Sequence, residues 1–110
     1  MYEYRAHVRS VYDGDTIRAD VDCGFGIWTA NQPLRLLGID APELGQPGGK
    51  EARDYLRGVL PIGTEVVIRT VKDEREKYGR LLAAISLNGE DVNLTMIQTG
   101  HAKPYDGGPR

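Results

Sequence analysis

The chain has 110 residues, which is enough for one small domain and too few for two. Its formal net charge is −2, which excludes a protein whose main role is to coat nucleic acid, because that binding needs an excess of Lys and Arg. An enzyme with a local basic patch is still allowed. The single cysteine, Cys23, excludes an internal disulfide and a cysteine-ligated metal cluster. Cys23 continues an apolar strand pattern, so we predict a small core residue.

The sequence shows no apolar run near the ~18 residues of a membrane span. Residues 1–5 do not have the character of a signal peptide. As given, the chain is therefore expected to be intracellular and free of membrane association. A processed secreted domain would look the same.

Two alternating segments at the start of the chain predict a hairpin. The turn lies at Asp13-Gly14, and the second strand covers residues 15–23 with apolar residues at its odd positions. Asp15 has the parity of that apolar face, so we expect it at the rim of the core, pointing inward. The first strand covers residues 2–12 and puts these residues on one face: Tyr2, Tyr4, Ala6, Val8, Ser10 and Tyr12.

A third strand is predicted over residues 27–39, with a bend at Pro33. Arg35 shares the parity of Leu37 and Ile39, which places it toward the interior. A Gly- and Pro-rich loop follows over residues 40–49. The next segment predicts an amphipathic helix ended by Pro61 and Gly63, with apolar residues at helical spacing: Ala52, Tyr55, Leu56, Val59 and Leu60.

Two more strands are expected over residues 65–71 and 80–87, before a turn at Asn88-Gly89. A short helix is expected over residues 93–99, capped by Asp91 or Asn93, and an irregular tail over 104–110. The chain is thus predicted to be a mainly β, α+β protein. We predict one domain, residues 1–110, with a five-stranded oligonucleotide-binding (OB-fold) barrel, a helix after the third strand and a short C-terminal helix. A flat five-stranded sheet with two helices on one face is the alternative.

The acidic residues suggest a metal site. Asp15 and Asp40 come from different strand ends, with the backbone carbonyl of Ala41 next to Asp40. Oxygen ligands suit a hard cation such as Ca²⁺ or Mg²⁺. A simple hairpin turn also explains Asp13-Gly14-Asp15. Glu43 lies three residues beyond Asp40 and could accept a proton from a water near that cation, although a solvated loop glutamate explains it as well.

Basic and aromatic residues suggest phosphate binding. Arg35 and Arg80 lie in or beside apolar strands, and a pair of guanidinium groups matches the oxygens of a phosphodiester. Exposed strand arginines, or arginines paired with structural acids, are the alternative. Lys77 and Tyr78 could contact a terminal phosphate or a base, unless their segment is only a solvated loop. Tyr105 could stack on a base or pack on the barrel.

These residues together resemble the staphylococcal nuclease-like (thermonuclease) domain family over nearly the whole chain. The resemblance implies an OB-fold barrel, one Ca²⁺ ion and hydrolysis of DNA and RNA phosphodiesters to 3′-phosphate and 5′-hydroxyl ends. The matching segments, in order, are Asp13-Gly14-Asp15-Thr16, Arg35-Leu36-Leu37-Gly38-Ile39-Asp40-Ala41-Pro42-Glu43, Lys77-Tyr78-Gly79-Arg80 and Gly100-His101-Ala102.

The resemblance also implies a role for each matching residue. Asp15, Asp40 and the carbonyl of Ala41 resemble the metal ligands of the family. Asp13 resembles a residue that supports these ligands without contacting the metal. Glu43 resembles the general base, whose role is debated within the family. The remaining roles fall to Arg35 and Arg80 as the phosphate clamp, Lys77 and Tyr78 as contacts to a terminal phosphate, and Tyr105, after a one-residue gap, as a base-stacking residue. Neither His7 nor His101 is predicted to be catalytic.

The predicted function is therefore a Ca²⁺-dependent nuclease acting as a monomer on DNA or RNA, with single strands favoured. This chain is slightly acidic where secreted members of the family are basic, so weaker and more metal-dependent substrate binding is expected. A catalytically silent barrel that binds nucleic acid or protein is the alternative. An unrelated barrel for single-stranded nucleic acid would need more aromatic residues and a basic charge.

Overall fold

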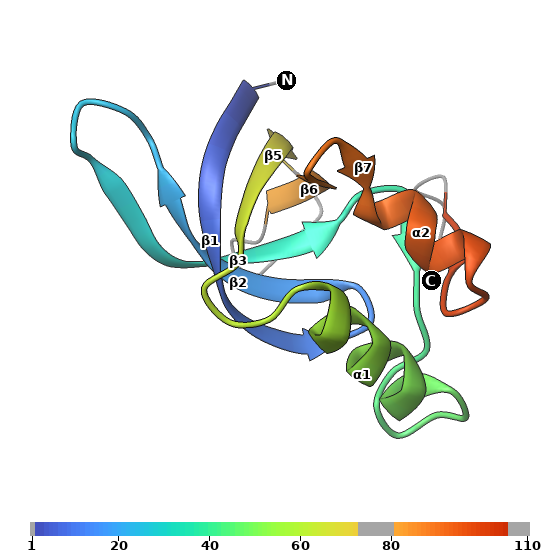
Figure 1. The fold of residues 1–110 in the computed structure, drawn as a ribbon. Coiled ribbons are helices and arrows are strands. Elements are labelled where there is room, and N and C mark those ends of the chain that lie inside the picture. Colours follow the sequence, from blue (N-terminus) through green and yellow to red (C-terminus); the bar gives the residue numbers. More distant parts are fainter. Residues whose placement is uncertain (1, 73–80, 106–110) are drawn as a thin grey trace.

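Five long strands form a barrel in the computed structural model, which describes residues 2–72 and 81–105 (Figure 1). Neighbouring strands are antiparallel through most of this sheet. The predicted strand boundaries hold within one to three residues. The five strands are β1 (Tyr2–Asp13), β2 (Thr16–Asp22), β3 (Trp28–Leu36), β5 (Glu65–Lys72) and β6 (Leu81–Leu87).

The barrel closes where β3 pairs with β6. The other pairings run in the order β3-β2-β1-β5-β6, and the last step joins the two edges in parallel, with Leu34 opposite Leu81 and Arg35 opposite Leu82. Closure removes the unpaired edges that an open sheet would leave. The predicted OB-fold barrel is thus confirmed, and the flat-sheet alternative is wrong.

Two helices pack against the barrel. Helix α1 (Gly49–Val59) lies across one end, with Ala52 and Leu56 buried against the strands (Figure 1). Helix α2 (Val92–Gln98) packs on β6, and the Asp91 carboxylate caps it by accepting from the Leu94 amide at 3.0 Å. Both predicted helices are confirmed. Over the described residues, no helix has the length and apolar character needed to cross a membrane.

Short strands tie the last described residues to the barrel. Strand β4 (Ile39–Asp40) pairs with β8 (Lys103–Pro104), and β7 (Glu90–Asp91) pairs with the end of β6. The predicted third strand therefore ends early and restarts as β4 after a turn at Leu37 and Gly38. The prediction of an irregular tail was wrong for Pro104, which pairs with Ile39; residues 106–110 lie outside the described part.

A β-bulge in β1 changes which side chains face the core. Between Val8 and Ser10 the strand has one residue more than its partner β2. Such an insertion reverses the alternation of the residues beyond it. Ser10 and Tyr12 are accordingly exposed, against the prediction, while Val11 and Asp13 are buried. The bulge thus turns Asp13 inward.

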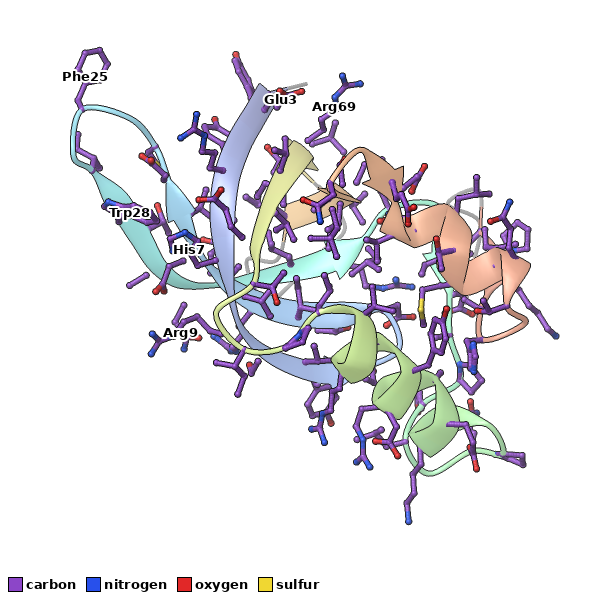
Figure 2. The ribbon with its side chains drawn as sticks, viewed as in Figure 1. Glu3, His7, Arg9, Phe25, Trp28 and Arg69 are labelled. Carbon is purple, nitrogen blue, oxygen red and sulfur yellow. The ribbon has the colours of Figure 1, made fainter. Side chains whose placement is uncertain are left out.

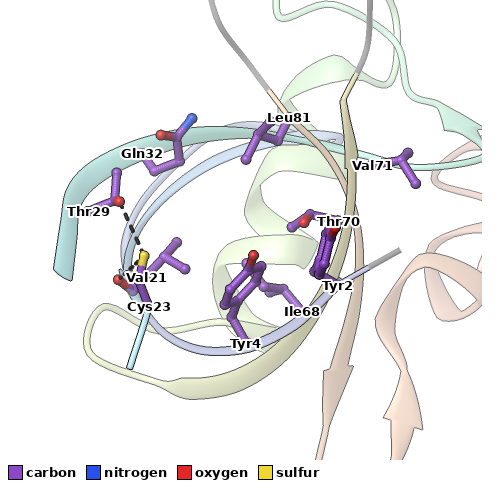
Figure 3. Close-up of a pocket in the computed structure, with 10 residues that line it drawn as sticks. All are labelled: Tyr2, Tyr4, Val21, Cys23, Thr29, Gln32, Ile68, Thr70, Val71 and Leu81. Carbon is purple, nitrogen blue, oxygen red and sulfur yellow. Dashed lines mark hydrogen bonds between the residues drawn. The ribbon is translucent and has the colours of Figure 1, made fainter. Parts of the chain in front are cut away.

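The barrel end opposite α1 is open. Looking into it, Tyr2, Tyr4 and Ile68 line a cavity of about 510 Å³ (Figure 3). The β2–β3 hairpin extends past this opening and carries the fully exposed Phe25 at its tip (Figures 1 and 2). Cys23 lies in this extension and is exposed, so its prediction as a core residue was wrong. The strand leaves the barrel one residue earlier, at Asp22.

Candidate active site

The turn between β1 and β2 approaches α1 and the start of the 41–48 loop very closely. A Cβ added to Gly14 would lie 2.7 Å from the Cβ atoms of both Ala41 and Ala52. Only glycine therefore allows this approach without displacing backbone. Within the turn, a carboxylate oxygen of Asp13 accepts from the Asp15 amide at 3.1 Å. Asp13 thus holds the turn that presents Asp15.

Asp15 is a buried carboxylate with several donors around it. It is 5% exposed, as its predicted inward orientation requires. Its Oδ2 accepts from the Ala41 amide at 2.8 Å and lies 3.3 Å from Arg35 Nη1. Its Oδ1 accepts from the Thr16 hydroxyl at 3.1 Å. The hairpin turn, β3 and the segment after β4 therefore meet at one carboxylate.

Arg35 lies between the two predicted metal ligands. Its side chain is buried, with Nη1 donating to the Leu36 carbonyl at 3.1 Å and Nη2 donating to Asp40 Oδ1 at 3.4 Å. The Asp40 side chain is 47% exposed, so this acid faces solvent while Asp15 does not. Four predicted site residues, Asp15, Arg35, Asp40 and Ala41, are thus brought together.

Glu43 begins a loop whose backbone is held on both sides. Its amide donates to the Gln46 side-chain oxygen at 3.2 Å, and its carbonyl accepts from the Gln46 amide at 2.9 Å. A Cβ at Gly49 would lie 1.9 Å from the Glu43 carbonyl oxygen. The close turn therefore depends on Gly49, while the Glu43 side chain is exposed. Sequence reasoning missed Gln46 and Gly49, whose roles show only in the folded loop.

A buried asparagine fixes the turn before Asp40, and sequence reasoning considered it only as a helix cap. The Asn93 amide nitrogen donates to the carbonyls of Leu37 at 2.8 Å and Ala83 at 3.0 Å. Its oxygen accepts from the Ile85 amide at 3.0 Å. Tyr105 reaches the same turn, since its amide donates to the Gly38 carbonyl at 2.8 Å. The tail is thereby attached two residues from Asp40.

Three predicted site residues, Lys77, Tyr78 and Arg80, lie outside the described residues. The described strand β6 starts at Leu81, whose partner Leu34 directly precedes Arg35. Their roles at the site stay predictions.

A comparison with protein families identifies the chain. The family described as staphylococcal nuclease homologue matches residues 33–108, which include the end of β3, both helices and the Arg35–Asp40 segment. The chain belongs to the staphylococcal nuclease family. The predicted resemblance is thereby confirmed.

Three relatives of this staphylococcal nuclease domain carry nuclease names. Endonuclease YhcR of Bacillus subtilis (strain 168) is 31% identical over 115 residues, covering 94% of this chain and 9% of that protein. A thermonuclease of Staphylococcus hyicus is 36% identical over 99 residues, covering 84% and 54%. A probable staphylococcal-like nuclease, CAN2 of Oryza sativa subsp. japonica, is 40% identical over 79 residues, covering 69% and 21%. The chain covers at most 54% of the length of these three relatives.

The oxygen donors of this staphylococcal nuclease domain fit a hard cation. Asp15 and Asp40 contribute carboxylates on either side of Arg35, and Ala41 contributes a neighbouring backbone carbonyl. Within the described residues, no three His, Cys, Asp or Glu side chains cluster as metal ligands. A cation here would therefore complete its six to eight oxygen ligands with water or phosphate oxygens. That open coordination suits binding of a substrate.

Burial raises the pKa of Asp15 to about 6, from 3.8, because a charged carboxylate loses its hydration inside the protein. The neighbouring Arg35 guanidinium lowers this pKa, and Asp13 raises it further. Between pH 3.8 and about 6 the folded protein therefore binds more protons at Asp15 than the unfolded chain does. The free energy of unfolding contributed by Asp15 falls as the pH rises through this window.

Asp15→Asn should remove this pH dependence. The quantity to compare is the unfolding free energy of the variant minus that of the wild type, both measured in chelator. This difference should rise by about 1–3 kcal/mol as the pH is raised from 3.5 to 7. Urea unfolding at a series of pH values measures the difference. Asp54→Asn, on the exposed face of α1, is the matched control and should give a nearly constant difference. Parallel pH curves for wild type and Asp15→Asn would contradict the assignment.

Proposed function

We propose that this domain is a calcium-dependent nuclease that hydrolyses phosphodiester bonds of DNA or RNA to 3′-phosphate and 5′-hydroxyl ends. The observation that carries the proposal is the convergence of Asp15, Arg35 and Asp40 from three segments, with nitrogen–oxygen distances of 3.3 and 3.4 Å. Membership of the staphylococcal nuclease family supports it.

Each residue has a defined task in the proposed reaction. Asp15, Asp40 and the Ala41 carbonyl would hold calcium, which supplies positive charge next to the phosphate oxygens. Glu43 accepts a proton from the attacking water, and its exposed side chain leaves it open to solvent water. Arg35, with Arg80, stabilises the charge that grows on the phosphate oxygens. The bond between phosphorus and the 5′-oxygen then breaks, and the 5′-oxygen takes a proton from solvent water to become the 5′-hydroxyl.

The proposed substrate is single-stranded DNA or RNA, bound by one copy of the domain. Single strands leave their bases free to stack on aromatic side chains, a role proposed for Tyr78 and Tyr105. Lys77 would contact a terminal phosphate. The link between Tyr105 and Gly38 supports a position for this tyrosine near the acidic residues.

Labelled single-stranded DNA tests the proposal directly. With calcium, the wild type should cut the strand, and excess chelator should stop the reaction. End-group analysis should find phosphate on the 3′ side of the cut and hydroxyl on the 5′ side. Asp40→Asn should weaken calcium binding measured by calorimetry, because one of two carboxylate ligands is lost, while the exposed Asp54→Asn should not. Binding of the strand without any cleavage would instead favour a silent barrel.

A further inference from the structure

A second hollow lies directly beside the predicted metal ligands. Its volume is about 380 Å³. One wall is formed by Asp40, Pro42 and Gln46, and the other by His101 and Lys103. The two walls are joined by the β4–β8 pairing, in which Asp40 and Lys103 are direct partners. The hollow therefore extends the candidate site. None of the roles predicted for the site residues uses it.

The charges in this hollow are unequal. The Asp40 carboxylate already lies 3.4 Å from the Arg35 guanidinium, which offsets its negative charge. Lys103 is exposed and makes no ion pair with any part of the chain that the structure describes. An ammonium group that pairs with no acid among residues 2–72 and 81–105, next to a wall of backbone and amide groups, suits an anionic ligand. The strongest chemical match is a phosphate group.

His101 gives the second wall a fixed shape. Its ring stacks on Tyr55 of α1 at a centroid distance of 4.3 Å and an interplanar angle of 14°. Its Nδ1 lies 2.7 Å from the Thr99 hydroxyl oxygen, which itself donates to the Thr95 carbonyl at 2.9 Å. The stacking and this hydrogen bond hold the ring from two sides. The ring is thus oriented before any ligand arrives, which lowers the entropy cost of binding.

We propose that this hollow is a substrate subsite for the nucleotide next to the phosphodiester that is cut. Lys103 contacts the phosphate of that nucleotide, and the His101 ring bounds the space for its sugar or base. The proposal rests on the proposed nuclease function, because it takes the adjacent Asp40 as part of the reaction centre. It assigns Lys103 to binding and to no chemical step.

Removing the charge of Lys103 tests the subsite. Binding of a fluorescent single-stranded 10-mer is measured by anisotropy in chelator, over a series of salt concentrations. Lys103→Gln should raise Kd several-fold at low salt and reduce the slope of log K against log salt by about 0.7, as expected for one lost contact to a single strand. Lys103→Arg should keep the wild-type slope. Arg5→Gln is the matched control, since Arg5 is an exposed cation on β1, away from this hollow.

Cleavage assays with calcium locate the subsite along the strand. Lys103→Gln should raise KM for strands extended on one side of the cut and leave kcat unchanged. It should have no effect on a dinucleoside monophosphate, whose only phosphate is the one that is cut. A wild-type Kd and salt slope in Lys103→Gln, or no binding by the wild type, would overturn the subsite. Binding that depends on Lys103 without any cleavage would overturn the nuclease proposal and leave an anion-binding hollow. The two failures are therefore distinguishable.

Discussion

Glu43→Gln is expected to lower kcat by about 10²–10⁴-fold, the usual contribution of a general base. Glutamine has nearly the same size and shape as glutamate but does not accept a proton from water. Folding should be unaffected, because the Glu43 side chain is exposed and its loop is held by backbone contacts to Gln46. Cleavage of labelled single-stranded DNA with saturating calcium measures the effect.

Two measurements separate loss of the base from other causes. Calcium affinity by calorimetry should match the wild type, because Glu43 is not among the proposed ligands. Glu51→Gln serves as the matched control, since Glu51 is also an exposed acid near the start of α1. It should cleave at close to the wild-type rate. A Glu43→Gln protein that retains near-normal kcat would remove Glu43 from the role of base.

The strands and helices were predictable because their apolar residues repeat at regular intervals. Period two is clear in β2, and helical spacing is clear in α1. Closure of the barrel is not encoded in any local pattern, since the parallel pairing of Leu34 with Leu81 joins residues far apart in sequence. The number and order of the strands are what indicate a closed barrel. Strands of two residues, such as β4 and β8, are too short to show a period.

The bulge in β1 shows where alternation fails. Two polar residues, Arg9 and Ser10, stand together here, and a period of two continued through them places Ser10 and Tyr12 inside. The structure buries Val11 and Asp13 instead, because the extra residue shifts the register against β2. Register depends on the hydrophobic pattern and on the turn, and a shift of one residue exchanges the two faces of the strand. A period of two continued through the bulge therefore does not predict the burial of Asp13, which orients the turn of Asp15.

The candidate site was predictable as a set of residues and less so as an arrangement. Motif spacing identified Asp15, Arg35 and Asp40, and the structure brings them together. The sequence did not indicate that Arg35 would lie between the acids, since this depends on three segments meeting. The supporting contacts of Asn93 were equally hidden, because a polar residue at the start of a helix usually predicts only a cap.

Arg35→Ala is expected to lower the free energy of unfolding by about 3–5 kcal/mol in chelator, the usual cost of breaking a buried ion pair on one side. Asp15 would remain buried without its guanidinium partner at 3.3 Å. Urea unfolding measures the loss. The loss of unfolding free energy should be larger at pH 7 than at pH 4.5, because a protonated Asp15 is neutral and is stabilised less by a positive neighbour. A loss below about 1 kcal/mol would show that Arg35 does not stabilise Asp15.

The double variant Asp15→Asn/Arg35→Ala identifies the cause of that loss. If the uncompensated carboxylate is responsible, the double variant should be more stable at pH 7 than Arg35→Ala alone, because an amide carries no charge to bury. Calcium bound as proposed would supply the same charge compensation, since Asp15 and Asp40 are the acids that Arg35 contacts. Saturating calcium should therefore stabilise Arg35→Ala more than it stabilises the wild type. Equal stabilisation would mean that the cation and the guanidinium act on different carboxylates.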